Sequence, residues 1–263
     1  YAYRLTMGEH VQTGVVAAAS VAAYDADRIK KHEFTRPVKE DDRVRQIEAL
    51  NAQTGPVFLV YHANADVDNL LAEVSKQTPD IDVTGLDAVR HQVWVIDDDS
   101  RIDLLTSSFD AMDALYVADG HHRSASGARV AHARRESGQN DSADASWNYF
   151  LSVIFPDNQM QILDYNRVIR DLNGMTSQAY LDRVAGAFHV EASDSPVKPA
   201  SPGEFGMYLE GRWYRLALPS DRIPDDPVAR LDVSLLADNL IAPILGIIDQ
   251  RTDDRIDFVG GIR

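Results

Sequence analysis

Apolar and polar residues follow two different periods along the chain, and each change of period marks the boundary of an expected element. Short runs of branched and aromatic residues predict buried strands, and the clearest of these runs is Val57–Tyr61. The same pattern predicts strands over residues 13–24, 91–96 and 114–118. Helical segments separate these strands, so the first half of the chain predicts a sheet with helices between its strands.

Apolar residues at helical spacing predict the helices. One helix begins at Pro37, because proline suits the first helical turn. That helix would turn Val44, Ile47 and Leu50 towards the core. Asp25 is a short acidic residue that predicts another helix start, over residues 25–29. Further helices are expected over residues 67–76, 101–109, 121–138, 176–188 and 227–245.

Turn residues predict two hairpins in the second half of the chain. One joins strands over residues 147–155 and 160–169, and the other, over residues 206–216, turns at Glu210–Gly211. Residues 193–203 contain three prolines and are the best candidate for a linker. Strands that are joined partly by helices and partly by hairpins predict an α+β fold with a mixed sheet flanked by helices.

The candidate site chemistry lies in the first part of the chain, which suggests a division of the fold. We expect a catalytic-like core over residues 1–157 and a C-terminal α+β portion over residues 158–263, packed on that core or forming one domain with it. The chain starts at Tyr1 rather than at a methionine, and both ends read like the interior of a fold. We therefore expect an N-terminal part of the full protein to be absent from this sequence.

Charge and composition exclude several classes of function. The net charge is -15, from 41 acidic and 26 basic residues, and such a surface disfavours nucleic acid as a partner. Cysteine is absent, which excludes disulfides, thiolate metal sites and cysteine nucleophiles. No apolar run approaches the roughly 18 to 20 residues that a membrane span needs. We expect a cytoplasmic protein with a small-molecule substrate and no membrane partner, and the oligomeric state stays open.

The strongest chemical signal is a turn between an expected strand and an expected helix. The strand breaks at Asp119–Gly120, where glycine allows a tight turn, and the helix begins at His121. The first amides of a helix and its dipole favour an anion at that point. The same turn carries His122 and Arg123. Acidic, imidazole and guanidinium groups thus gather where a phosphate or carboxylate would bind.

A second basic segment supplies further cations. Phosphate transfer depends mainly on positioning and charge stabilisation, so more than one cation must converge. Arg36, Lys39 and Arg43 are the candidates, and the last two lie one helical turn apart on one face. Glu33 is the preferred base for activating a substrate hydroxyl.

Each residue of the turn has a proposed role. Arg123 can bind two phosphate oxygens with its guanidinium fork, and Gly120 and His121 complete the phosphate-binding turn. His122 can donate to another oxygen or act as an acid or base near neutral pH. Asp119 can hold Mg²⁺ or orient an imidazole. No site for a transition metal is expected, because adjacent histidines rarely bind one ion together and no third ligand is evident.

The same residues also have structural interpretations. The turn can be a capped helix start with a buried histidine hydrogen-bonded to the backbone. The basic segment can be a solvated helix whose ion pairs contribute little individually. Arg251, Asp253 and Asp257 read most simply as a charged turn followed by a strand.

Three segments together resemble the bacterial domain-of-unknown-function 1015 family. They are His32-Glu33-x-Thr35-Arg36-Pro37-x-Lys39-Glu40-x-Asp42-Arg43, Ala118-Asp119-Gly120-His121-His122-Arg123 and Arg255-Ile-Asp-Phe-Val-Gly-Gly261. The resemblance extends over nearly the whole chain, including residues 164–167 and 231–235. It indicates a family and says little about activity.

A looser resemblance is to the ParB and sulfiredoxin superfamily. Its members hold a Gly-x-His-Arg-like turn at a helix start and bind nucleotide phosphates there, and some are free-serine kinases. The resemblance implies a nucleotide, ATP or ADP, together with Mg²⁺. Sulfiredoxin-type chemistry needs a cysteine in the turn, where this chain has His121. An aromatic residue and an acidic residue usually follow the arginine, whereas here Ser124 and Ala125 follow it.

These observations predict a nucleotide-dependent phosphotransferase that acts on a small hydroxylated metabolite, with free serine suggested by the superfamily resemblance. One alternative is a non-catalytic ParB-like module that binds a nucleotide and regulates or contacts DNA. A continuous basic face would favour that module, but residues 28–45 mix basic with acidic residues. A second alternative is a phosphate-ester hydrolase that uses the same turn without a nucleotide.

Overall fold

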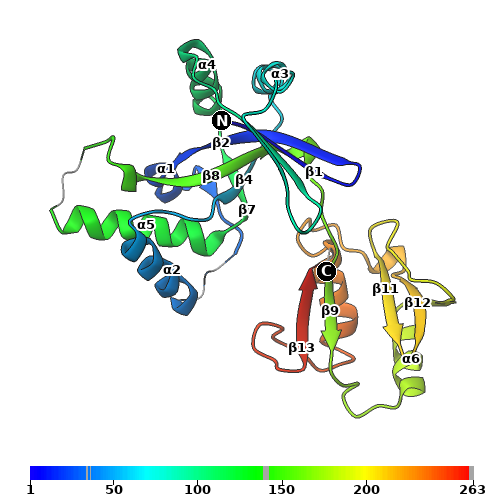
Figure 1. The fold of residues 1–263 in the computed structure, drawn as a ribbon. Coiled ribbons are helices and arrows are strands. Elements are labelled where there is room, and N and C mark those ends of the chain that lie inside the picture. The colour runs from blue at the N-terminus through cyan, green and yellow to red at the C-terminus, as the bar shows by residue number, and fades with distance from the viewer. Residues whose placement is uncertain (34, 36, 139–141, 261–263) are drawn as a thin grey trace. The chain divides into compact units, whose positions relative to one another are not determined.

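The structure is a computed structural model, and it describes all residues except 34, 36, 139–141 and 261–263 (Figure 1). The chain divides into two compact units, Tyr1–Gln161 (unit 1) and Ile162–Arg263 (unit 2). Each unit has its own cluster of buried apolar side chains. The fold is α+β, with a large mixed sheet flanked by helices, as the alternation of periods predicted.

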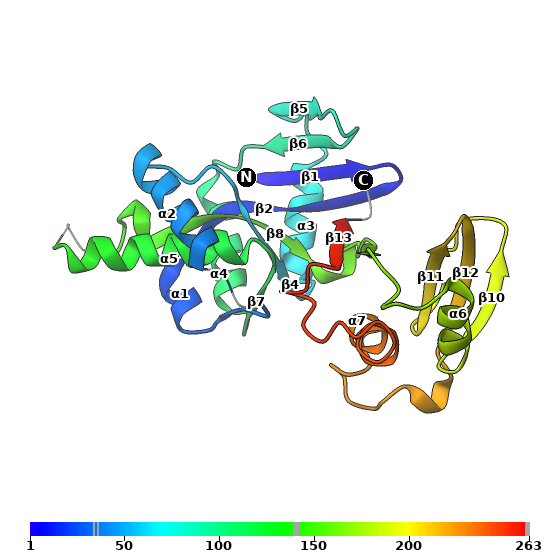
Figure 2. The ribbon, with the colours of Figure 1, turned by 90° about the horizontal axis from the view of Figure 1, so that it is seen from below.

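Unit 1 is built on one eight-stranded sheet. Its strands are β1 (Ala2–Met7), β2 (His10–Ser20), β3 (Ile29–Lys30), β4 (Val57–Tyr61), β5 (Ile81–Thr84), β6 (Arg90–Trp94), β7 (Leu115–Asp119) and β8 (Tyr149–Pro156). The order across the sheet is β3-β7-β4-β8-β2-β1-β6-β5, and Figure 2 shows the last four strands side by side. The pairs β3–β7 and β4–β8 are parallel, and the other neighbours are antiparallel.

Helices cover both faces of this sheet. They are α1 (Val21–Asp25), α2 (Pro37–Leu50), α3 (Ala65–Val74), α4 (Asp99–Asp110) and α5 (His121–Glu136), with short 3-10 turns at Ser146–Asn148 and Asp157–Gln159. Figure 1 shows α3 and α4 on one face and α1, α2 and α5 on the other. Leu59, Tyr61 and Phe150 are buried in the core that these layers enclose.

Strand β2 approaches β8 so closely that one position accepts only glycine. A Cβ atom at Gly14 would lie 2.2 Å from the carbonyl oxygen of Ile154 and 2.7 Å from Cδ1 of Phe155. The first of these is a backbone atom of a paired strand, so it cannot move without disturbing the sheet. Gly14→Ala is therefore expected to lower the free energy of unfolding by about 3 kcal/mol, the upper end for overpacking. Denaturant unfolding measures this change, and an unaltered midpoint would contradict it.

Unit 2 contains two small sheets and a leucine-rich helical segment. Its elements are β9 (Tyr165–Ile169), α6 (Ser177–Ala185), β10 (His189–Ser193), β11 (Glu204–Leu209), β12 (Arg212–Ala217), a 3-10 turn (Ser220–Arg222), α7 (Asp232–Leu236), a π-helical turn (Ala237–Ile241) and β13 (Ile256–Gly260). The sheets have the orders β10-β12-β11 and β13-β9. The predicted hairpin turn at Glu210–Gly211 is confirmed, with both residues at positive φ.

Several predicted elements are confirmed, and others differ from the prediction. The strand expected over residues 13–24 is present but ends at Ser20, whose hydroxyl caps α1 by accepting from the amide of Ala23. Helix α1 ends at Asp25, where a helix start was predicted. The helix expected over residues 227–245 begins only at Asp232 and changes to a π-helical turn.

The hairpin predicted between residues 147–155 and 160–169 is also absent, because its two strands belong to different sheets. Strand β8 pairs with β2 and β4, whereas β9 pairs with β13 near the end of the chain. The predicted turn is a 3-10 turn followed by residues 160–164, which form no strand. Because β13 is far from β9 in the sequence, the residues around β9 give no sign of this pairing. None of the helices in the described part of the chain has the length and apolarity needed to cross a bilayer.

Candidate functional site

The predicted strand, turn and helix around Asp119 are present in unit 1. Strand β7 ends at Asp119, Gly120 is the N-cap, and α5 begins at His121. Gly120 has φ 96° and ψ 29°, a left-handed conformation that favours glycine. Among the described residues, no side chain caps this helix start. The N-terminus of a sixteen-residue helix therefore lies one residue beyond the C-terminal end of strand β7.

The Arg123 side chain turns back over Gly120. A Cβ atom at Gly120 would lie 2.8 Å from Nε of Arg123, so glycine leaves room for the guanidinium as well as for the turn. On its other side Arg123 approaches Gly55, where a Cβ would lie 3.4 Å from its Cδ. The guanidinium forms an ion pair with the exposed carboxylate of Asp119. Two glycines and one acidic residue thus hold Arg123 at the start of the helix.

Arg123 and Arg43 line the same cavity, of about 210 Å³. Arg123 comes from the turn at the start of α5, whereas Arg43 comes from α2 in the second basic segment. The remaining walls are contributed by α2 and the loop that follows it, namely Gln46, Ile47, Ala52, Gln53, Thr54 and Gly55. Two arginines that line one cavity beside the first turn of α5 favour an anionic ligand.

The cavity exists because α2 buries almost none of its apolar side chains. The prediction that Val44, Ile47 and Leu50 point into the core is wrong: the first two are only half-buried, and Leu50 is 56% exposed. Helix α2 packs closely against α5, and polar contacts join the two helices. Arg129 binds Glu40 at 3.1 Å and Asp41 at 2.8 Å. The Ser126 hydroxyl donates to the Glu40 carbonyl at 3.2 Å. Ile47 on the same helix lines the cavity.

His121 is buried at the first position of α5, with 4% of its surface exposed. Its Nδ1 lies 3.5 Å from Oε2 of Glu33, and its ring meets that of His32 edge-on at 4.4 Å. Its Nε2 has no hydrogen-bond partner among the described residues. The structural interpretation of a histidine satisfied by the backbone therefore does not apply to this nitrogen. Burial lowers the pKa of His121, and His32 lowers it further, while Glu33 raises it.

The lowered pKa of His121 predicts a pH dependence of stability. The folded imidazole binds its proton at a lower pH than the unfolded one, whose pKa is about 6.5. The contribution of the neutral His121 imidazole to the free energy of unfolding is therefore fully present above about pH 6.5, and it is lost as the pH falls towards the folded pKa. His121→Asn should show a smaller loss than wild type in denaturant titrations between about pH 5 and pH 8. If the free energy of unfolding depended equally on pH in wild type and His121→Asn, the prediction would be contradicted.

The other predicted site residues differ in their exposure and in whether they line the cavity. Glu33 is exposed beside His121. His122 is half-buried, and its carbonyl accepts from Ser126 Oγ at 2.6 Å. Lys39 is exposed on α2 and does not line the cavity. Arg36 lies outside the described residues.

Sequence reasoning missed the loop that closes the cavity. Gln53 and Thr54 line it, and Gly55 allows the close approach of Arg123. The available signal was a polar loop between an expected helix and the strand Val57–Tyr61, since loops at strand ends often carry binding residues. The described part of the chain holds no group of three His, Cys, Asp or Glu side chains that could bind a metal ion.

Comparison with known proteins places this site in a family. A family model described as "Protein of unknown function (DUF1015)" matches residues 1–234. The chain belongs to this family. No curated protein and no solved structure matches it. The matched part of the DUF1015 chain includes the helix start at Gly120 and the whole of α2, so both arginines of the cavity lie within it.

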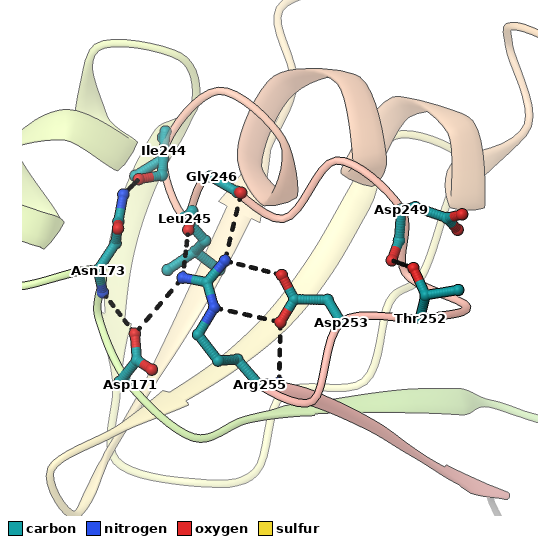
Figure 3. Close-up of polar contacts among 9 residues, drawn as sticks. All are labelled: Asp171, Asn173, Ile244, Leu245, Gly246, Asp249, Thr252, Asp253 and Arg255. Atoms are coloured by element: carbon teal, nitrogen blue, oxygen red, sulfur yellow. Dashed lines mark hydrogen bonds and ion pairs between the residues drawn. The ribbon is translucent and has the colours of Figure 1, made fainter.

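The third segment that suggested the DUF1015 family lies beyond the matched residues, and its arginine is structural (Figure 3). The Arg255 guanidinium donates to the carbonyl oxygens of Leu245 and Gly246 at 3.0 and 3.2 Å. It also binds both carboxylate oxygens of Asp253, at 3.2 and 2.8 Å, and lies 3.7 Å from Asp171. Arg255 thus ties the end of the helical segment in unit 2 to the turn before β13.

Proposed function

We propose that this DUF1015 protein is a nucleotide-dependent phosphotransferase that acts on a small hydroxylated metabolite, with free serine as the first substrate to test. The observation that carries the proposal is the cavity shared by Arg123 and Arg43 at the N-terminus of α5. Two arginines from distant segments and a helix N-terminus suit the phosphates of a nucleotide, either ATP or ADP.

In this proposal the two arginines position the phosphates. Arg123 binds two oxygens with its fork, and Arg43 binds a third from the opposite wall. Gly120, His121 and His122 do not line the cavity, and in this proposal they form the helix start that positions Arg123. The role of the two arginines is electrostatic, because phosphoryl transfer needs its developing charge stabilised more than it needs covalent help from the protein.

Glu33 is the proposed base. The substrate hydroxyl oxygen attacks the terminal phosphorus, the bond from that phosphorus to the bridging oxygen of the nucleotide breaks, and the hydroxyl proton passes to Glu33. The Glu33 carboxylate lies 3.5 Å from Nδ1 of His121, beside the start of α5. The exposure of Glu33 leaves the carboxylate accessible to a small substrate.

Asp119 is the proposed protein ligand for the Mg²⁺ that accompanies the nucleotide. Magnesium sites of this type use one or two carboxylates and complete their coordination with phosphate oxygens and water, so a cluster of three protein ligands is not required. When bound, Mg²⁺ neutralises phosphate charge. Asp119 is 73% exposed and also binds Arg123, which keeps its carboxylate at the entrance of the phosphate site.

The resemblance of the Asp119–Arg123 turn to the ParB and sulfiredoxin superfamily supports nucleotide binding, and its free-serine kinases suggest the acceptor. The test is nucleotide consumption with a panel of hydroxy amino acids and sugars, in wild type and His122→Ala. Substrate-dependent consumption that decreases in the variant supports the proposal. Consumption that is undiminished in His122→Ala would remove His122 from the mechanism, and phosphate release from esters without a nucleotide would indicate a hydrolase.

A further inference from the structure

We propose that a second cavity of unit 1 binds the nucleobase of the nucleotide whose phosphates lie between Arg43 and Arg123. This inference rests on the proposed function and adds the part of the site that recognises the ring. The second cavity has a volume of about 320 Å³. Its most informative walls are Gln53, Gly127, Arg134, Trp147, Tyr149 and Phe150.

The two cavities are neighbours that share walls. Ile47, Ala52 and Gln53 line both of them. The first cavity alone falls below the range of about 300 to 1,000 Å³ that is usual for small-molecule sites, and the second lies at its lower end. Together the two cavities lie well within that range. An elongated ligand can therefore place one end in each cavity without displacing the sheet.

Helix α5 gives the direction and reach of the combined site. Arg123 lies in the phosphate cavity, whereas Gly127, Val130 and Arg134 lie in the second one. Residues 123 and 134 are about 16 Å apart along the axis of an α-helix. The charged phosphates and the uncharged ring of a nucleotide would thus lie along one side of this helix, with the phosphates at its N-terminus.

The second cavity has the chemistry of a site for a heteroaromatic ring. Trp147 and Tyr149 line this cavity and are half-buried, and an aromatic side chain accepts any nucleobase by stacking. Phe150 also lines it, but its side chain is 1% exposed and belongs to the core. The indole Nε1 of Trp147 is buried, so a ligand in the cavity would contact the rest of the ring rather than this nitrogen.

Arg134 is the one arginine among the described residues that line the second cavity, and it contacts uncharged groups. Its guanidinium lies 5.5 Å from the centre of the Trp147 ring and donates to Oδ1 of Asn51 at 2.9 Å. Stacking and an amide acceptor already engage the guanidinium, although neither contact neutralises its charge. An anion at Arg134 remains a competing outcome, so the test must separate binding of the ring from binding of phosphate.

The experiment compares ADP with inorganic pyrophosphate by titration calorimetry. Trp147→Leu keeps an apolar side chain and removes the aromatic ring. We expect it to weaken ADP binding by about tenfold, within the range that stacking of one base contributes, and to leave pyrophosphate binding unchanged. Thermal unfolding of the variant shows whether the fold is preserved.

Gly127→Ala provides a second variant, whose fold the same thermal unfolding checks. Its Cβ would lie 3.3 Å from Cβ of Phe150, a tight contact, and 3.6 Å from Nε2 of Gln53, and both residues line the second cavity. This added methyl group should also weaken ADP binding selectively.

The outcomes separate this inference from the proposed function. If both variants bind ADP as wild type does, or lose ADP and pyrophosphate equally, the nucleobase assignment is overturned while phosphate binding stands. If pyrophosphate binds wild type as tightly as ADP does, the ring contributes nothing and the assignment is likewise overturned. If wild type binds neither probe, the proposed function fails and this inference fails with it.

Discussion

Replacing Arg123 with glutamine is expected to weaken nucleotide binding by about 10- to 100-fold. A hydrogen bond to a charged group contributes roughly 1.5 to 3 kcal/mol, and tenfold in affinity corresponds to about 1.4 kcal/mol. Arg123 lies over Gly120 at the start of α5 and lines the phosphate cavity, so its loss removes the central cation of the proposed site. Calorimetry with ADP and pyrophosphate measures the effect, and both affinities should fall together.

The matched control is Arg45→Gln. Arg45 is on α2, its side chain is 75% exposed, and it does not line the cavity. The two variants have the same net charge, so a difference between them reports position rather than overall charge. Arg123→Lys should recover only part of the affinity, because lysine keeps the charge but cannot form the two-pronged contact. Equal affinities for Arg123→Gln and Arg45→Gln would show that the cavity does not bind phosphate.

Replacing Glu33 with glutamine is expected to lower kcat by about 100- to 10,000-fold, the usual contribution of a general base. Glutamine keeps the size of the side chain and cannot accept the hydroxyl proton. Nucleotide affinity should change little, because Glu33 lies beside His121 and does not line the phosphate cavity. Steady-state kinetics with the accepted substrate, together with calorimetry, separates the two effects.

Glu48→Gln is the control for this substitution, since Glu48 is an exposed acidic residue of α2. A normal kcat in Glu33→Gln would reject Glu33 as the base. The same variant also reports on its neighbour: Glu33 raises the pKa of His121, so its neutralisation should lower that pKa further. If His121 were the base, the acid limb of the rate profile would therefore shift to lower pH while activity persisted.

The candidate site lies where the apolar side chains of α2 are not buried in the core of unit 1. Ion pairs of Arg129 connect α2 to α5, and Ile47 lines both cavities rather than packing in the core. Two buried nitrogens nearby, Nε2 of His121 and Nε1 of Trp147, lack hydrogen-bond partners in the described part of the chain. Natural proteins depart from the rules of packing and polar satisfaction mainly at functional sites, which is the argument for treating this region as one.

The sequence by itself determined the features that a few neighbouring residues encode. The strand Val57–Tyr61, the start of a helix at Thr176 and the turn at Gly120 all follow from local conformational preference, and each is found as predicted. A strand that ends in glycine and opens into a helix needs no distant partner to be recognised.

Only the tertiary structure decided which distant segments meet. Strand β9 pairs with β13 instead of forming a hairpin, and Arg43 shares a cavity with Arg123 although many residues separate them. Helix α2 satisfied the apolar spacing of a core helix yet stands away from the core. Strand pairing and helix placement depend on the total free energy of many weak contacts between whole elements. No short stretch of sequence determines that total.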